Sequence, residues 1–354
     1  MAIQKYATST PRIGKMAGAI LKHAIPVEVL GITGKMHNMD QNDSDTVVFR
    51  RWLPTGATAS TTAGGVNNLL PINTWTVTTA AHLTSEGVTP IAETIAPQDI
   101  TVVLNQYSCL YQYSDKTAYL YEDNVPREMK VLTGERMGLV RELIRYGALK
   151  GCTNKYYAGD TSRAAVDETI SLGILRKVTR SLQANRGRMV TEIIDGSKNY
   201  NTAPVERGYL VFAHSDMEND IRELPGFKEV SEYGSRKTLV HEMELGSADR
   251  YRFICSPELA PYLAGGAAVG STGLVAADST NIDVYPIIVV AADAWGDVAL
   301  RGLNSFDVTS IPPGTKSNSD PLGQRGVIGA IFWSAAFIQN DGWMAVVEAG
   351  ATAL

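Results

Sequence analysis

Cysteine is scarce in this chain of 354 residues: only Cys109, Cys152 and Cys255 occur, far apart and without a CxxC pair. An odd, sparse count argues against a disulfide framework and indicates a reducing compartment. Long apolar runs are also missing, since the longest, 284–295 and 327–338, are too short to span a bilayer. No signal peptide is recognised at the N-terminus either. We therefore expect a soluble protein that has no contact with a membrane.

Positive charge is absent from one long stretch and concentrated in two others. No Lys or Arg lies between Trp52 and Asp115, whereas residues 1–38 carry five basic residues and a single acidic one. A second basic stretch, 171–191, has no acidic residue. The net charge of −5 excludes a global basic field of the kind that marks many nucleic-acid-binding proteins. Within the first stretch, residues 53–82 carry no charge of either sign. This uncharged stretch favours a loop that lies against protein, because solvated linkers normally carry charge.

The hydrophobic pattern predicts two helices among several strands. Apolar residues at helical spacing, preceded by Asn124 and Pro126, indicate a long helix over 126–157, with Glu142 and Arg145 paired on its outer face. A second helix is expected over 168–188. Strands are predicted at 46–53 and 99–115, and a closing hairpin is predicted from the apolar runs on either side of Asn340–Gly342.

Chemical motifs are weak. The glycines of GQRGVIG, residues 323–329, follow a loop and precede a predicted strand, so the helix N-terminus that holds a pyrophosphate is missing. The segment around His241–Glu244, even with His214 and Asp216, lacks metal-ligand spacing, because neighbouring residues on a strand point to opposite faces. Cys109 has no acid–base partner nearby in sequence and is interpreted as a buried thiol. We expect no catalytic residue, no metal site and no cofactor.

Three stretches carry a family resemblance: LTSEGVTPIAETIAPQDITVVLNQYSCLYQYSD at 83–115, YPIIVVAADAWGDVALRG at 285–302 and SDPLGQRGVIGAIFWSAAFIQNDGW at 319–343. Their order and spacing resemble the major capsid proteins of tailed double-stranded-DNA bacteriophages, in particular the short-tailed group, whose fold is shared with herpesvirus capsids. The resemblance implies an α+β fold in four parts. These are an N-terminal arm (1–46), an extended β-hairpin loop (47–118), a peripheral domain with a long spine helix and the final β-hairpin (119–165 and 304–354), and an axial domain (166–303).

The resemblance also implies a function. The chain would assemble with itself into hexamers and pentamers of an icosahedral shell around double-stranded DNA, in the host bacterial cytoplasm, and remain in the virion. Scaffolding, decoration and portal proteins are the other expected partners. Contact with packaged DNA would be non-specific. Because the extended loop has no Lys between Trp52 and Asp115, we expect no Lys–Asn isopeptide bond from this stretch.

Two sets of residues are candidates for these contacts. The first is expected to make self-assembly contacts and comprises Trp75, Leu83, Glu86, Asp320 and Arg325. The second is expected to face DNA and comprises Arg176, Lys177, Arg180, Arg186 and Arg188. A solvated helix face remains the alternative for the basic set. For the whole chain, the alternatives are an encapsulin-like or other shell-forming protein of the same fold, another virion component, an enzyme with an unrecognised site and a β-rich adhesion protein.

Overall fold

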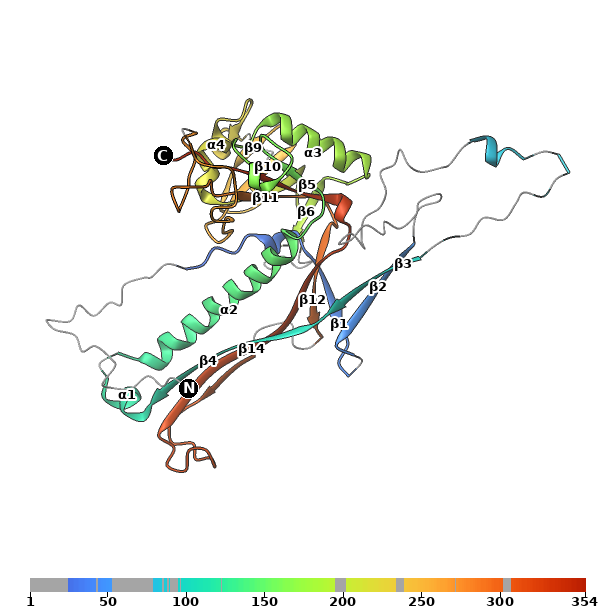
Figure 1. Cartoon of the computed structure of the whole chain (residues 1–354). Helices are drawn as coiled ribbons and strands as arrows, with labels where there is room; N and C mark the ends of the chain where they lie inside the picture. Colours follow the sequence, from blue (N-terminus) through green and yellow to red (C-terminus); the bar gives the residue numbers. More distant parts are fainter. Residues whose placement is uncertain are drawn as a thin grey trace.

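The computed structural model describes residues 25–42, 44–52, 79–84, 86–87, 89, 95, 97–121, 123–194, 202–233, 239–270, 272–301 and 307–354. These residues form three sheets: an eight-stranded sheet, a five-stranded sheet beside a long helix, and a two-stranded antiparallel ladder (Figure 1). The helices are α1 (Asp115–Leu120), α2 (Val125–Leu149), α3 (Leu172–Ala184) and α4 (Glu218–Arg222).

The eight-stranded sheet has the order β5-β15-β11-β7-β10-β9-β8, with β6 paired to β7. Its strands are β5 (Lys155–Tyr157), β6 (Val190–Ile194), β7 (Thr202–Ala213), β8 (Lys228–Glu229), β9 (Glu244–Ala248), β10 (Tyr251–Cys255), β11 (Tyr285–Val290) and β15 (Met344–Ala349). Every residue of β10, β11 and β15 is buried. Such continuously buried strands require both faces of the sheet to be covered.

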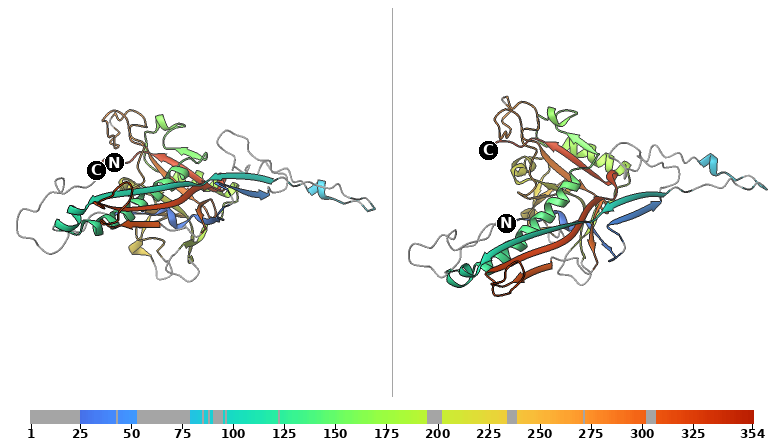
Figure 2. Two further views of the ribbon diagram at one scale, coloured as in Figure 1. Left: turned by 90° about the horizontal axis from the view of Figure 1, so that it is seen from below. Right: turned by 60° about the horizontal axis from the view of Figure 1, so that its bottom comes forward.

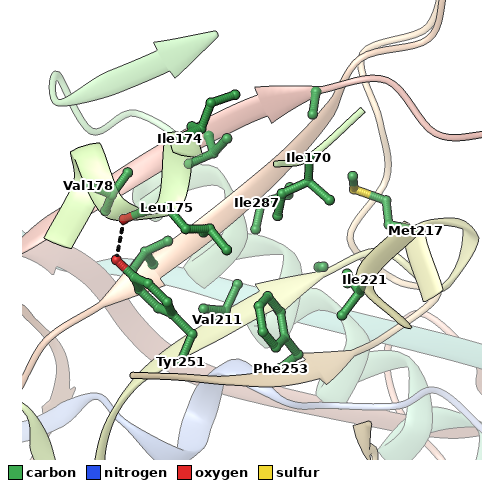
Figure 3. Packing of buried hydrophobic residues seen from close by; sticks show 14 of the residues in the cluster. Ile170, Ile174, Leu175, Val178, Val211, Met217, Ile221, Tyr251, Phe253 and Ile287 are labelled. Atoms are coloured by element: carbon green, nitrogen blue, oxygen red, sulfur yellow. Dashed lines mark hydrogen bonds between the residues drawn. The ribbon is translucent and has the colours of Figure 1, made fainter. Parts of the chain in front are cut away.

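Helix α3 covers one face of this sheet. Its stripe at helical spacing, Ile174, Leu175, Val178 and Leu182, is buried as predicted and packs against side chains of β7, β10 and β11 (Figure 3). The Tyr251 hydroxyl donates to the Leu175 carbonyl at 2.7 Å and ties the sheet to the helix. The alternate residues of these strands point to the opposite face of the sheet. There they form a second buried cluster with the end of α2.

The five-stranded sheet lies along α2 (Figure 2). In this sheet, strands β4 and β14 run beside each other over most of the length of β14. Its strands are β1 (Lys35–Met39), β4 (Asn105–Ser114), β12 (Trp295–Leu300), β13 (Asp307–Ile311) and β14 (Arg325–Ile338). Met137, Val140 and Ile144 of α2 pack on this sheet. The predicted cap is confirmed, since the Asn124 side chain accepts from the Arg127 N–H.

Two details of the long helix differ from the prediction. The helix ends at Leu149 rather than near 157, because Lys155–Tyr157 pair with β15 instead. Glu142 and Arg145 do approach each other, at 3.7 Å, but both are buried and so do not lie on an outer face. A chain segment that sequence periodicity does not reveal covers them: Val29 and Leu30 donate their N–H groups to Glu142.

The prediction of a closing hairpin in 304–354 is wrong. β14 and β15 do not pair with each other; β14 pairs with β4, β12 and β13, and β15 pairs with β5 and β11. Residues 332–338 of β14, which a hairpin would pair with β15, pair instead with β4 and β12, while β15 gains two neighbours, β5 and β11. Asp341 in the connecting turn accepts from the Thr153 N–H and directs the chain towards the eight-stranded sheet.

Candidate assembly surfaces

A two-stranded ladder projects from the body of the molecule (Figure 1). It is formed by β2 (Thr46–Trp52) and β3 (Pro97–Val103), which are antiparallel, and we call it the β2–β3 ladder. The paired strands confirm that residues on either side of the uncharged stretch run out and back together. Residues 53–78 between them, Trp75 included, lie outside the described residues.

The inner face of the ladder is attached to the body. Phe49 stacks on Phe337 of β14 with ring centroids 4.9 Å apart and an interplanar angle of 7°. Ile100 and Val102 are buried in the same cluster. Arg51 donates to the Gln339 carbonyl at 3.0 Å. The base of the ladder therefore has a defined position, because both packing and a charge-assisted hydrogen bond hold it.

The outer face of the ladder is apolar and electrically balanced. Trp52 is 59% exposed and Val48 is 55% exposed. Between them, Arg50 binds Asp99 through two hydrogen bonds of 2.7 and 2.8 Å, and this bond lowers the pKa of the Asp99 carboxyl. Since the one charged pair neutralises itself, this face can meet another protein surface without burying an unpaired charge.

The remaining candidates for self-assembly contacts differ in their surroundings. Leu83 is 81% exposed, and Glu86 is exposed in a turn beyond the ladder. Asp320 and Arg325 contact each other within the chain: the Arg325 N–H donates to the Asp320 carboxylate at 2.8 Å. The Arg325 guanidinium also donates to the Ser319 carbonyl. This pair holds its own loop, and a role towards a neighbouring subunit stays a prediction.

The glycines of GQRGVIG lie where other backbone atoms and a tyrosine ring approach too closely for a Cβ atom. A Cβ on Gly326 would lie 2.3 Å from the ring of Tyr113, and one on Gly329 would lie 3.0 Å from the Cys109 carbonyl. Gly323 has a φ of +66°, in the left-handed region that glycine tolerates. Strand β14 begins at Arg325, directly after this loop. The segment is therefore the entry to a closely packed strand, as predicted, rather than a phosphate loop.

The candidate basic residues lie on or just after α3, and all five side chains are exposed. Arg176, Lys177 and Arg180 lie on the face of the helix opposite its buried stripe. Arg176 approaches Asp249 at 4.0 Å. Arg186 takes a φ of +58° just after the helix ends at Ala184. The surface is basic, and its orientation in an assembly is untested.

Among the groups that could carry chemistry, Glu244 is bound by another side chain and the cysteines are buried. Glu244, in the segment considered for a metal, receives two hydrogen bonds from Arg252, of 2.7 and 2.9 Å. Within the described residues, no group of three or more His, Cys, Asp or Glu side chains is placed to hold a metal ion. The three cysteines are free and buried, and burial raises the pKa of Cys255 to about 12. No helix in the described part of the chain is long and apolar enough to cross a membrane.

The sequence analysis missed Val48, Trp52 and the Arg50–Asp99 pair as candidate surface residues. Their signal was present: in TVVFRRW every second residue, from Val48 to Arg50 to Trp52, points to the outer face.

Comparison with known proteins gives consistent results. No family model matches the sequence. The chain is 21% identical over 266 residues to the major capsid protein of Pseudomonas phage KPP21, and the match covers 69% of this chain and 66% of that protein, just under two thirds of its length.

Solved structures align over almost the whole chain. The capsid structure of cyanophage P-SCSP1u aligns with a TM-score of 0.59 at 11% identity, covering 96% of this chain and 93% of the other. The capsid of Ralstonia phage GP4 also gives 0.59 at 11% identity, covering 97% and 98%. The head structure of Helicobacter pylori bacteriophage KHP40 gives 0.57 at 10% identity, covering 98% and 96%. The predicted resemblance is confirmed: this chain has the α+β fold of the capsid proteins of tailed bacteriophages.

Proposed function

We propose that this chain is a phage major capsid protein that assembles with itself into hexamers and pentamers of an icosahedral shell around double-stranded DNA. The observation that carries the proposal is the alignment of nearly the full chain with capsid chains. The projecting β2–β3 ladder supports it. A ladder with an exposed apolar face gains stability only when that face meets a further surface.

The four-part division remains part of the proposal. We infer that α2 and the five-stranded sheet form the peripheral domain, that the eight-stranded sheet with α3 forms the axial domain, and that the part of 47–118 that precedes β4 reaches across a neighbour. Head-to-tail contacts of this kind close rings and allow many copies to enclose a volume. The strand pairing refines the proposed division, since β5 and β15 belong to the eight-stranded sheet and β12 to the five-stranded sheet.

Expression of the full chain, followed by size-exclusion chromatography and electron microscopy, tests the proposal. Icosahedral particles, formed by the chain alone or with phage lysate as a source of scaffolding protein, are the expected result. A soluble monomer that never assembles under either condition would contradict the proposal. A denaturing gel of the particles should show monomers without a covalent ladder.

An encapsulin-like compartment is the second candidate, because its subunits share the fold. The basic face of α3 favours the phage capsid. We infer that Arg176, Lys177, Arg180, Arg186 and Arg188 face the interior and reduce the repulsion from packaged phosphates without reading sequence. A map of DNA-filled particles should show these side chains on the inner surface, and an outward orientation would contradict this assignment. Particles that enclose a protein cargo and no nucleic acid would favour the compartment.

A further inference from the structure

Residues 27–34, which we call the arm root, lie wedged between both sheets and the long helix. Ser256, which follows β10, donates its hydroxyl to the Val27 carbonyl at 2.9 Å. The indole N–H of Trp295 in β12 donates to the Thr33 hydroxyl at 3.0 Å. The arm root is therefore held at its two ends by two different parts of the molecule.

Its centre is held by a single buried carboxylate. The N–H groups of Val29 and Leu30 both donate to Oε1 of Glu142, each at 2.8 Å. The Glu142 side chain is 1% exposed. A Cβ on Gly31 would lie 2.6 Å from Nη1 of Arg145, so the arm-root backbone also rests directly on the guanidinium. Docking of this segment is what buries both charged groups.

The buried cluster has more negative than positive charge. Arg145 donates through Nε to Oδ2 of Asp297 at 2.7 Å, while its Nη1 is 3.7 Å from Oε2 of Glu142. One guanidinium thus serves two carboxylates. Among the described residues, Oε2 of Glu142 and Oδ1 of Asp297 have no hydrogen-bond partner, although both are buried. Unpaired negative charge at a buried site is costly.

The other charged groups at this site do not supply the missing positive charge. From the arm root, Glu28 adds a further negative charge that acts on Glu142. Arg141 of α2 approaches Glu28 at 3.3 Å, and both are one-third exposed. From β12, Asp297 is the charged neighbour, and the contacts from Ser256 and Trp295 are uncharged. A proton on Glu142 would remove the imbalance, because Arg145 would then face a single ionised carboxylate.

We propose that the Glu142 carboxyl takes up one proton from solvent when the arm root is docked, so that docking strengthens as the pH falls. Two buried acids that share too little positive charge cannot both ionise easily.

The direction of the pH dependence follows from the burial of Glu142 in the docked state. Burial raises the pKa of Glu142, against the opposing effect of the hydrogen bonds from Leu30 and Val29 and of Arg145. With the arm root undocked, Glu142 returns to solvent and to its ordinary pKa of about 4.3. The docked state therefore binds the proton more tightly. Docking gains stability as the pH falls through the raised pKa of the docked state, and the gain is complete below the ordinary pKa.

Hydrogen exchange of the full chain at the Val29 and Leu30 amides tests this directly. Protection factors, referred to the intrinsic exchange rate at each pH, would be measured between pH 5 and 8 under conditions where exchange reports the opening equilibrium. Protection should rise as the pH falls, by up to about tenfold per pH unit, the limit for one proton per opening event. Protection that does not change with pH would overturn the proposal without any variant.

Two variants locate the proton. Glu142→Gln keeps an oxygen for the two N–H groups and should abolish the pH dependence. Asp297→Asn keeps an acceptor for Arg145 but removes the competing negative charge, and it should reduce the pH dependence. Asp99→Asn, in the exposed β2–β3 ladder, is the matched acid-to-amide control and should keep the wild-type slope. An unchanged slope in both cluster variants would overturn the proposal, and if Glu142→Gln does not fold, Asp297→Asn and the wild-type profile decide the question.

Discussion

The eight-stranded unit, which is the eight-stranded sheet with α3, and the β2–β3 ladder differ in how far their side chains are buried within the chain. Every residue of β11 is buried within the chain, whereas alternate residues of β2 are exposed. The eight-stranded sheet is covered on one face by α3 and on the other by the end of α2 and its neighbours. The ladder is covered on its inner face, and its apolar outer face is open. One region completes its burial within the chain, and we expect the other to complete it only in an assembly.

The largest effect is expected in the eight-stranded unit. Phe253→Ala removes a fully buried ring from β10 and should lower the free energy of unfolding by about 3–5 kcal/mol, measured by chemical denaturation. Val48→Ala on the ladder is the matched truncation at an exposed position and should change it by less than about 0.5 kcal/mol. Equal losses would remove the distinction between the two regions.

The second pair of variants tests packing beside the long helix. Gly326→Ala places a methyl group against the Tyr113 ring and should lower the free energy of unfolding by about 1–3 kcal/mol, because the buried neighbours have to move. Gly134→Ala in α2 meets open space and should raise it by up to about 1 kcal/mol through helix propensity. Thermal unfolding of both variants measures these shifts, and a stabilised Gly326→Ala protein would show that this strand entry is loosely packed.

The third prediction separates folding from assembly. Trp52→Ala should leave the free energy of unfolding of the subunit within about 0.5 kcal/mol of wild type. The same change should raise the concentration needed for particle formation about tenfold, the effect of about 1.4 kcal/mol from a lost aromatic contact. Light scattering against protein concentration measures the second quantity. Gln183→Ala, at an exposed site on α3, is the control, and equal effects from both variants would argue against the ladder as a contact surface.

The smallest effect is expected from the ion pair on the ladder. The hydrogen bonds from Arg50 lower the pKa of Asp99, so the folded ladder binds this proton less tightly than the unfolded chain does. The stabilisation is complete above the ordinary pKa of about 3.9 and is lost as the pH falls through the lowered value. Amide exchange at Phe49 and Ile100 should show this loss in acid. In Asp99→Asn the dependence should be absent, and a persistent acid effect would assign it to another group.

Much of this architecture was predictable because it rests on local patterns. The cap at Asn124, the stripe of α3 and the strand after Gly323 each follow from residues close in sequence. The strands of the ladder were found for the same reason, through their β-branched and aromatic residues.

The errors share one cause, which is competition from distant segments. A turn sequence at Asn340–Gly342 favours a hairpin, but β15 finds two partners in the eight-stranded sheet that sequence alone does not place nearby. Glu142 has the spacing of a surface ion pair, yet Val29 and Leu30 cover it from more than a hundred residues away. Local periodicity predicts which residues share one face of a helix or strand. It does not predict which distant segment packs against that face.

The separation of β14 from β15 has a consequence for the order of events during synthesis. Strand β14 pairs with three strands of its sheet, β15 lies between β5 and β11, and both follow every other described strand in the chain. A ribosome therefore translates almost the entire sequence before either sheet can close. Until then the nascent chain lacks the strands that join its early segments, and its apolar surface stays exposed to neighbouring chains. The same late strands that complete the subunit would thus set the moment at which it becomes competent to meet its copies.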